Sequence, residues 1–410
     1  MDKEYIRLKY ACYTSNVSMS IVGNLPPLLF LTFRQQYGIS FSLLGLLVLV
    51  NFVTQLVIDL IFSFFSKKFN IQKTVRLMPC LTVAGLILYA LSPVIFKGAV
   101  YAGLVLGTVV FSAAAGLGEV LISPIIASIP APDPDREMSK LHSIYAWGVV
   151  AIIPVATVFL FLFGYESWPI LTLIFALIPL VSAVLFATCS VPCLESEEGP
   201  IGVKKLFKSK SLWACVAAIF LGGAAECTMA QWSSGYLEMA LGIDKVLGDI
   251  FGVTLFALML GIGRTMYAKM GKNIGKDLTL GAIGATVCYF IAVITDVHFI
   301  GLIACALCGF CVSMLWPGNL VVATDRFPRG GVFIFAMMAA GGDLGASVGP
   351  QLVGMVTDII ANSQWVLDLS QKAGLSPEQL GMKAGVFVGM LFPLAAVPLY
   401  FVMWKGKKKS

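Results

Sequence analysis

Long apolar segments alternate with short clusters of charged, proline and glycine residues along the whole chain. A helix of about 20 apolar residues spans a bilayer, so each long segment predicts one membrane-spanning helix. Twelve such helices are predicted, over residues 10–33, 41–65, 75–96, 99–128, 143–163, 168–190, 212–237, 246–269, 277–295, 298–323, 331–360 and 380–404. The sequence therefore predicts an all-α, polytopic membrane protein with 12 transmembrane helices.

A polar segment near the middle of the chain predicts a division into halves. Residues 191–211 carry three glutamates followed by four lysines. An internal repeat at an offset of 204 residues supports the division, because Tyr37-Gly38-Ile39-Ser40 aligns with Leu241-Gly242-Ile243-Asp244. We expect two pseudo-symmetric six-helix halves, 1–190 and 212–410, joined by a cytoplasmic linker, 191–211. In transporters built this way the substrate sits where the halves meet.

The basic residues predict the orientation. With both termini in the cytoplasm, the inside segments hold 23 Lys and Arg residues and the outside segments hold five. Basic segments stay on the cytoplasmic side, so we expect a multi-pass protein of the cell membrane with both termini cytoplasmic. The acidic residues near the N-terminus and the lack of a small-residue cleavage site predict that the first helix is retained.

Composition excludes several functional classes. Of 410 residues, 58% are hydrophobic and 12% are charged, which excludes a soluble globular protein. The net charge of +6 is scattered, so no basic face for nucleic acid is predicted. No GxxxxGK[ST] motif is present, which excludes nucleotide hydrolysis by this chain. Nearly all of the ten cysteines lie in apolar segments and the two histidines are far apart, so we expect no enzyme, metal site or cofactor.

Four acidic residues lie deep within predicted spans, away from the span ends: Asp59, Glu119, Glu226 and Asp343. An ionisable side chain inside a membrane is costly and marks a functional site by default. We therefore expect these four residues to take part in proton coupling. A carboxylate buried without a counter-ion favours its neutral form, which links proton occupancy to substrate occupancy.

The helix 41–65 carries a polar stripe, because Asn51, Gln55, Asp59, Ser63 and Lys67 recur every four residues. The stripe must face protein or water. It either lines a path for substrate, with a proton at Asp59, or forms hydrogen bonds to a neighbouring helix.

Glu119 follows two glycines, Gly116 and Gly118, that let a helix or ligand approach closely. It is the first candidate for a proton-coupling or hydroxyl-binding acid. Alternatively, it is a buried acid that the next helix satisfies through His142, Ser143 or Tyr145.

Further candidates for contact with substrate come from several helices. Glu226, Gln231 and Trp232 supply a carboxylate, an amide and an indole, a set suited to a polyhydroxylated ring, although Trp232 also fits an interfacial belt. Trp316 and Asn319 flank a proline that bends their helix and frees a carbonyl. The remaining substrate-binding candidates are Asn24, Asn51 and Gln55.

Two features have competing interpretations. The glycine-rich run 341–345 is interpreted as a close-packing and hinge element, with Asp343 either as its polar lock or as a second proton site. Arg264 is either an anchor at the cytoplasmic end of its helix or the partner of an acid. Ser376-Pro377-Glu378 predicts the start of the last helix, with Ser376 as N-cap.

The twelve spans, central loop and parallel halves resemble the major facilitator superfamily. The Glu-x-x-x-x-Gln-Trp-x-Ser run at 226–234, Trp-Pro-Gly at 316–318 and Gly-Gly-Asp-Leu-Gly at 341–345 are similar to fucose-permease-like sugar carriers. This resemblance implies a helix-4 glutamate that handles protons and sugar, a position that Glu119 matches. The first helix offers only Asn16 and Asn24 where those carriers have an aspartate.

The sequence as a whole favours a secondary active transporter that moves a small polar solute, first of all a sugar, by proton-coupled alternating access. We expect a monomer whose partners are the solute, protons and membrane lipid, without nucleic acid. The alternatives are an exporter of amphipathic compounds, a carrier of a non-sugar solute, and a membrane receptor that transports nothing.

Overall fold

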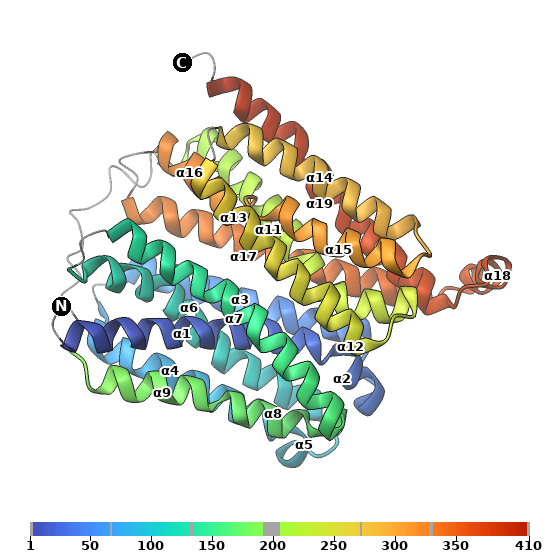
Figure 1. Cartoon of the computed structure of the whole chain (residues 1–410), viewed down its shortest axis with the longest axis horizontal. Coiled ribbons are helices and arrows are strands. Elements are labelled where there is room, and N and C mark those ends of the chain that lie inside the picture. The colour runs from blue at the N-terminus through green and yellow to red at the C-terminus, as the bar shows by residue number, and fades with distance from the viewer. Residues whose placement is uncertain are drawn as a thin grey trace. The chain divides into compact units, whose positions relative to one another are not determined.

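The computed structural model describes residues 3–65, 68–130, 134–191, 206–270, 273–327 and 331–407 (Figure 1). These described residues form helices and connecting turns, with no strand among them. Eleven helices are long and apolar enough to span a membrane, and α1 and α2, bent by 46°, make a twelfth when counted as one span. The prediction of an all-α polytopic membrane protein is confirmed.

The contacts divide the chain into two compact units, residues 1–32 with 50–199 and residues 33–49 with 200–410. Segment 33–49 therefore packs with the second unit, although it lies in the predicted first half. Most of the predicted linker, residues 192–205, lies outside the described residues. The boundary between the predicted halves stays a prediction.

The helices up to residue 191 cover the predicted spans with small shifts. They are α1 (Lys3–Leu28), α2 (Phe30–Tyr37), α3 (Phe41–Phe65), α4 (Ile71–Ala90), α5 (Ser92–Ile95), α6 (Val100–Ser128), α7 (Pro134–Phe163), η2 (Tyr165–Ser167), α8 (Trp168–Phe175) and α9 (Leu177–Ala187). The bend after α1 follows Pro26 and Pro27 in its last turn. Proline lacks the N–H that would continue the helix, which explains a break at this point.

The later helices include one that the spans did not predict. They are α11 (Lys210–Leu241), α12 (Lys245–Leu247), the π-helical η3 (Gly248–Thr254), α13 (Leu255–Met270), α14 (Ile274–Ile294), α15 (His298–Val312), α16 (Pro317–Arg326), α17 (Gly331–Ala361), α18 (Gln364–Ala373) and α19 (Pro377–Lys407). The unpredicted helix, α18, is shorter than a span. Ser376 Oγ accepts the N–H of Gln379 at 3.1 Å, which confirms Ser376 as the N-cap of α19.

Glycines let helices of the first unit approach backbone to backbone. A Cβ on Gly85 of α4 would lie 2.6 Å from the Phe111 nitrogen of α6, and one on Gly107 of α6 would lie 2.8 Å from the Tyr89 nitrogen of α4. Such contacts are shorter than any side chain allows. Without a hydrophobic driving force between helices in lipid, this close packing supplies much of the association energy.

The glycine-rich segment of α17 plays the same part in the second unit. Gly341, Gly345 and Gly349 lie four residues apart and face α11, where a Cβ on Gly345 would overlap the carbonyl oxygen of Phe220. A Cβ on Gly349 would lie 2.9 Å from the Ala224 oxygen. The close-packing interpretation of this segment is confirmed.

The two glycines aligned by the internal repeat end their helices in the same way. Gly38 and Gly242 have φ of 66° and 65°, a left-handed conformation that glycine adopts without strain. Each donates its N–H to the carbonyl four residues earlier, of Arg34 and Glu238 respectively, at 3.0 Å. The next helix begins three residues later in both cases.

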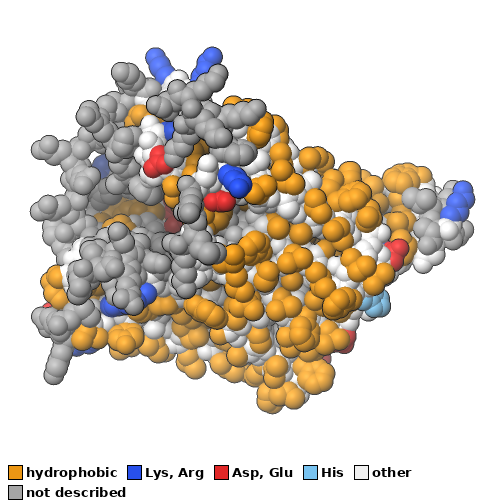
Figure 2. All heavy atoms as spheres, turned by 45° about the horizontal axis from the view of Figure 1, so that its top comes forward, with side chains coloured by type: hydrophobic (Ala, Val, Ile, Leu, Met, Phe, Trp, Pro, Cys, Tyr) orange, Lys and Arg blue, Asp and Glu red, His pale blue; other side chains and the backbone are white. Residues whose placement is uncertain are grey.

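Large apolar side chains are exposed over much of the surface, as Figure 2 shows for one face. Phe161, Leu162 and Val402 each expose about two thirds of their area, at 66%, 66% and 67%. A surface of this kind suits contact with lipid tails rather than water.

Candidate functional site

The polar stripe of α3 faces α6 within the first unit. Asn51, Gln55 and Asp59 are buried. Asn51 Oδ1 accepts hydrogen bonds from Gln55 Nε2 at 3.1 Å and from the Ser112 hydroxyl of α6 at 2.5 Å. The side chain of Ser63 and all of Lys67 lie outside the described residues. The described part of the stripe thus forms hydrogen bonds to a neighbouring helix, one of its two interpretations.

Gly116 brings α3 and α6 together beside two of the predicted acids. A Cβ at Gly116 would lie 3.0 Å from the Gln55 oxygen. One turn further along each helix, a carboxylate oxygen of Asp59 and one of Glu119 lie within 4.8 Å of each other. The first unit therefore contains a pair of neighbouring acids inside two of its membrane-spanning helices.

The pairing of Glu119 with His142, Ser143 or Tyr145 stays a prediction. The Tyr145 hydroxyl lies beside α1, 3.3 Å from where a Cβ on Gly23 would stand. The side chain of His142 lies outside the described residues. Asn24 is half-buried and donates to the Ser20 carbonyl of its own helix at 2.9 Å.

Arg264 of α13 pairs with Glu226 of α11 in the second unit. Its Nη2 lies 3.0 Å from Glu226 Oε1, and its Nε donates to the Ser313 carbonyl at 3.1 Å. The interpretation of Arg264 as the partner of an acid is confirmed. Glu226 stands at the middle of α11, and the long arginine side chain reaches it from α13.

The carbonyl that Arg264 uses comes from a break in a membrane-spanning segment. Turn residues 313–316 separate α15 from α16, which begins at Pro317. Broken helices leave carbonyls without partners in the helix, and transporters use such breaks at binding sites. The half-buried Trp316 ring packs against Gly342 and Gly223. A Cβ added to Gly342 would lie 2.7 Å from the ring, and a Cβ added to Gly223 would lie 3.0 Å from it. The neighbouring Asp343 of α17 is buried.

The other predicted contact residues are enclosed within the second unit. Trp232 is 1% exposed, and its Nε1 donates to the Pro350 carbonyl at 2.9 Å. An interfacial belt position for Trp232 is therefore wrong, because the indole packs inside the unit beside Phe41, with ring centres 6.1 Å apart. Asn319 is buried and donates to the Leu315 carbonyl at 2.6 Å and the Tyr400 hydroxyl at 2.9 Å. Gln231 is buried as well.

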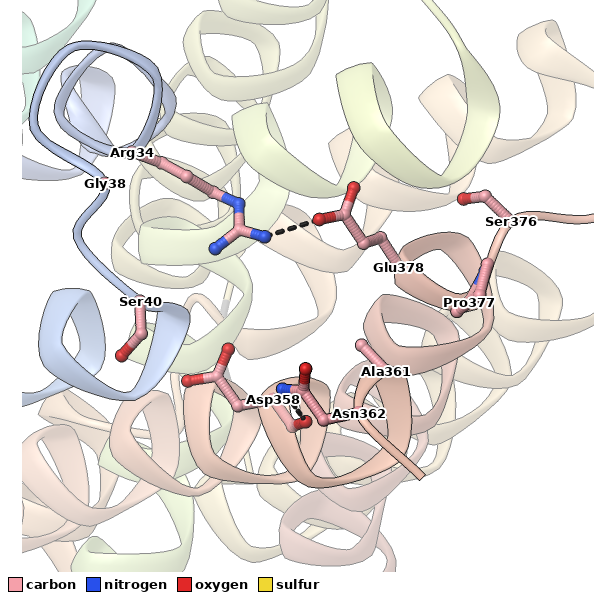
Figure 3. A pocket seen from close by; sticks show the side chains of 9 residues that line it. All are labelled: Arg34, Gly38, Ser40, Asp358, Ala361, Asn362, Ser376, Pro377 and Glu378. Atoms are coloured by element: carbon pink, nitrogen blue, oxygen red, sulfur yellow. Dashed lines mark hydrogen bonds and ion pairs between the residues drawn. The ribbon is translucent and has the colours of Figure 1, made fainter. Parts of the chain in front are cut away.

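A pocket of about 600 Å³ opens at the helix ends of the second unit (Figure 3). Arg34 of α2 forms an ion pair with Glu378 of α19, and its guanidinium lies 4.1 Å from the centre of the Phe41 ring. The remaining lining residues are Gly38, Ser40, Asp358, Ala361, Asn362, Ser376 and Pro377.

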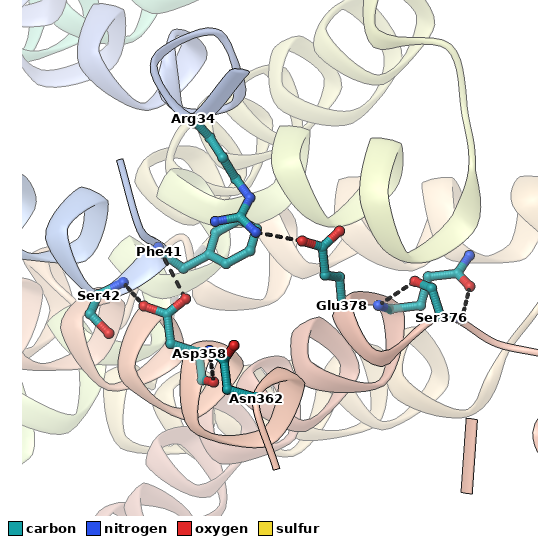
Figure 4. Close-up of polar contacts among 8 residues, drawn as sticks. Arg34, Phe41, Ser42, Asp358, Asn362, Ser376 and Glu378 are labelled. Carbon is teal, nitrogen blue, oxygen red and sulfur yellow. Dashed lines mark hydrogen bonds and ion pairs between the residues drawn. The ribbon is translucent and has the colours of Figure 1, made fainter. Parts of the chain in front are cut away.

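Asp358 of α17 holds the start of α3 beside this pocket (Figure 4). Its carboxylate accepts the N–H groups of Phe41 at 3.2 Å and Ser42 at 2.6 Å. A carboxylate at a helix N-terminus satisfies free N–H groups and matches the helix dipole. Sequence reasoning missed this contact, because Asp358 lies 316 residues from Ser42 and no local pattern joins them.

Comparisons with known proteins agree with this architecture. The sequence profile of the Major Facilitator Superfamily matches residues 12–350. No curated protein sequence matches the chain.

Solved structures share the fold at low sequence identity. A bacterial homolog of the human lysosomal transporter Spinster, inward-facing and occupied, has a TM-score of 0.73 and 13% identity, and the match covers 99% of this chain and 98% of that one. A D-xylose-proton symporter has a TM-score of 0.72 and 13% identity, and the match covers 97% of this chain and 99% of the symporter. The E. coli fucose:proton symporter FucP has a TM-score of 0.57 and 17% identity, with 96% and 99% covered.

The family profile spans most of the chain, and the superfamily consists of carriers rather than enzymes. The membrane-spanning helices and the similar structures fit that assignment. This chain belongs to the Major Facilitator Superfamily and is a multi-pass membrane transporter.

Proposed function

We propose that the chain is a proton-coupled secondary transporter of a small polar solute, first of all a sugar. It works in the cell membrane as a monomer by alternating access, with both termini in the cytoplasm. Two of the structural relatives are named as proton symporters of D-xylose and of fucose. The distribution of basic residues supports the orientation, with 23 inside and five outside.

The observation that carries the proposal is the pair Asp59 and Glu119. Their carboxylate oxygens lie within 4.8 Å of each other in helices that span the membrane. Two negative charges so close together, away from bulk water, repel strongly, and a shared proton removes the repulsion. The pair is thus suited to binding a proton on one side of the membrane and releasing it on the other.

Amide and aromatic side chains, considered separately in each unit, support a solute rich in hydroxyls. Asn51 and Gln55 continue the stripe of Asp59 with two amides, which can both donate and accept hydrogen bonds. Trp316 in the second unit presents a half-buried aromatic face, the type of surface that packs against the C–H groups of a sugar ring. We assign proton coupling first to Glu119, with Asp59 as its partner. Asp343 is a further candidate.

The test is uptake of labelled monosaccharides into proteoliposomes, with and without an inward proton gradient. We expect the parent chain to accumulate one sugar when the gradient is present. Glu119→Gln should abolish this accumulation while sugar exchange without a gradient persists, because the neutral amide cannot release a proton. Glu166→Gln, which changes an exposed glutamate, is the matched control and should behave like the parent.

Two results would contradict the proposal. Equal gradient-driven accumulation by the parent and by Glu119→Gln would remove the proton site. Failure to accumulate any sugar would remove the substrate class and favour amphipathic compounds or other solutes.

A further inference from the structure

The ion pair of Arg264 and Glu226 combines a fixed cation with an acid that can be displaced. Both residues lie in membrane-spanning segments, where an arginine is expensive and marks function by default. Arg264 is held by its Nε, which donates to the Ser313 carbonyl at the helix break. This anchor leaves the two terminal nitrogens of the guanidinium to face an acid.

Glu226 contacts the guanidinium of Arg264 through only one of its two carboxylate oxygens. One of its oxygens, Oε1, meets Nη2 at 3.0 Å. The other, Oε2, is closed to solvent and has no hydrogen-bond partner among the described residues. A guanidinium can bind a carboxylate through two parallel hydrogen bonds, so a better-placed carboxylate would compete with Glu226.

We propose that the solute is a sugar acid whose carboxylate binds Arg264 in place of Glu226, which then takes up a proton. This inference rests on the proposed transport of a hydroxylated solute. It adds that the solute carries a negative charge, and it names the residue that recognises this charge. Arg264 is the residue that selects the acid over the neutral sugar.

Charge balance links the solute to a proton. Before binding, the positive Arg264 and the negative Glu226 cancel. After binding, the solute carboxylate cancels Arg264, and the released Glu226 would be an unpaired charge in the membrane unless it gains a proton. A buried unpaired charge is strongly unfavourable, so one proton enters with each carboxylate. The site stays neutral in both states.

Among the titratable groups in this part of the second unit, Arg264 and Glu226 are joined by an ion pair. The other titratable side chains around this part of α11 are Cys227 of α11 itself, Cys308 of α15, Tyr289 of α14, Asp343 of α17 and Tyr400 of α19. The hydroxyls of Tyr289 and Tyr400 are bonded to the Ala225 and Ala218 carbonyls, both at 2.8–2.9 Å. Among these described side chains, Arg264 is the only one that carries a positive charge.

The experiment measures binding of matched sugar pairs to the purified full-length chain in detergent by calorimetry. The pairs are D-glucose with D-glucuronate, D-galactose with D-galacturonate, and D-mannose with D-mannuronate. We expect one acid to bind the parent at least about tenfold more tightly than its neutral partner, because charge-assisted bidentate bonds are stronger than neutral ones. Its affinity should rise from pH 8 to pH 6, where a sugar carboxylate remains ionised.

Two variants separate the roles of the pair. Arg264→Lys should weaken binding of the acid at least about tenfold, since lysine cannot form two parallel hydrogen bonds to a carboxylate. Arg326→Lys, which changes an arginine that bonds Ser211 at 3.3 Å, is its matched control. Glu226→Gln should bind the acid more tightly and without dependence on pH, a gain that misfolding cannot produce.

The inference is overturned when no acid binds, when acid and neutral sugar bind equally, or when Arg264→Lys binds the acid as the parent does. A Glu226→Gln variant whose affinity still rises at low pH also overturns it. Gradient-driven accumulation of a neutral sugar through Glu119, with no binding of any acid, would leave the proposed function standing. Accumulation of no solute and binding of no acid would remove both.

Discussion

Among single residues, Trp232 shows how burial changes an assignment made from side-chain type. Its indole is 1% exposed and donates to the Pro350 carbonyl at 2.9 Å. This geometry makes Trp232 a link between α11 and α17.

We predict that Trp232→Phe lowers the free energy of unfolding by about 1–3 kcal/mol, because the buried Pro350 carbonyl loses its donor. The thermal midpoint measured in detergent should fall, while the KM for solute stays within a factor of two or so of the parent. Trp365→Phe, at a tryptophan that is 59% exposed, is the control and should change neither quantity. A raised KM with an unchanged thermal midpoint would restore Trp232 as a solute-binding residue.

The sequence identified the acids of the candidate site but not all of their partners. Asp59 and Glu119 stood out because ionisable residues are rare in spans. Their proximity depends on the contact of α3 with α6 at Gly116, which no local pattern reveals. Glu226 and Arg264 are 38 residues apart, and only the fold shows that the Arg264 side chain of α13 reaches Glu226 of α11.

Among elements, the contact of α11 with α17 depends on a row of glycines. We predict that Gly345→Ala lowers the free energy of unfolding by about 1–3 kcal/mol. The added methyl would overlap the Phe220 carbonyl and force the helices apart. Size-exclusion chromatography after heating should show loss of the monodisperse peak at a lower temperature than for the parent.

Gly261→Ala in α13 is the matched control, because a Cβ at this position would point into open space rather than against another helix. This control should be neutral or slightly stabilising, as alanine favours a helix more than glycine does. Equal thermal midpoints for Gly345→Ala and the parent would show that α17 can shift away from α11 without lowering the free energy of unfolding.

Helices long enough to span a membrane were predictable because some 20 consecutive apolar residues are a strong signal. Breaks within spans were less visible. Pro317 indicated a bend, but the separation of α15 from α16 by residues 313–316 depends on how the freed carbonyls are satisfied, here partly by Arg264. The ten-residue α18 was missed, because a short amphipathic helix resembles a polar loop when only spans are counted.

At the scale of the whole molecule, the basic residues make a prediction that the helices alone cannot make. Helix bounds show where the chain can cross the membrane, and they fit either orientation equally well. The count of 23 basic residues against five breaks this symmetry, because Lys and Arg are retained on the cytoplasmic side during insertion. Both termini should then be cytoplasmic, and the segment of α18 should lie outside.

Fusions of reporter proteins in a bacterial host test this orientation. A green fluorescent protein after Ser410 should fluoresce and an alkaline phosphatase at the same place should be inactive, since the phosphatase folds only outside the cytoplasm. A phosphatase placed after Asn362, which follows α17 and precedes α18, should be active. The reverse pattern at both places would invert the predicted topology, with both termini outside and the segment of α18 in the cytoplasm.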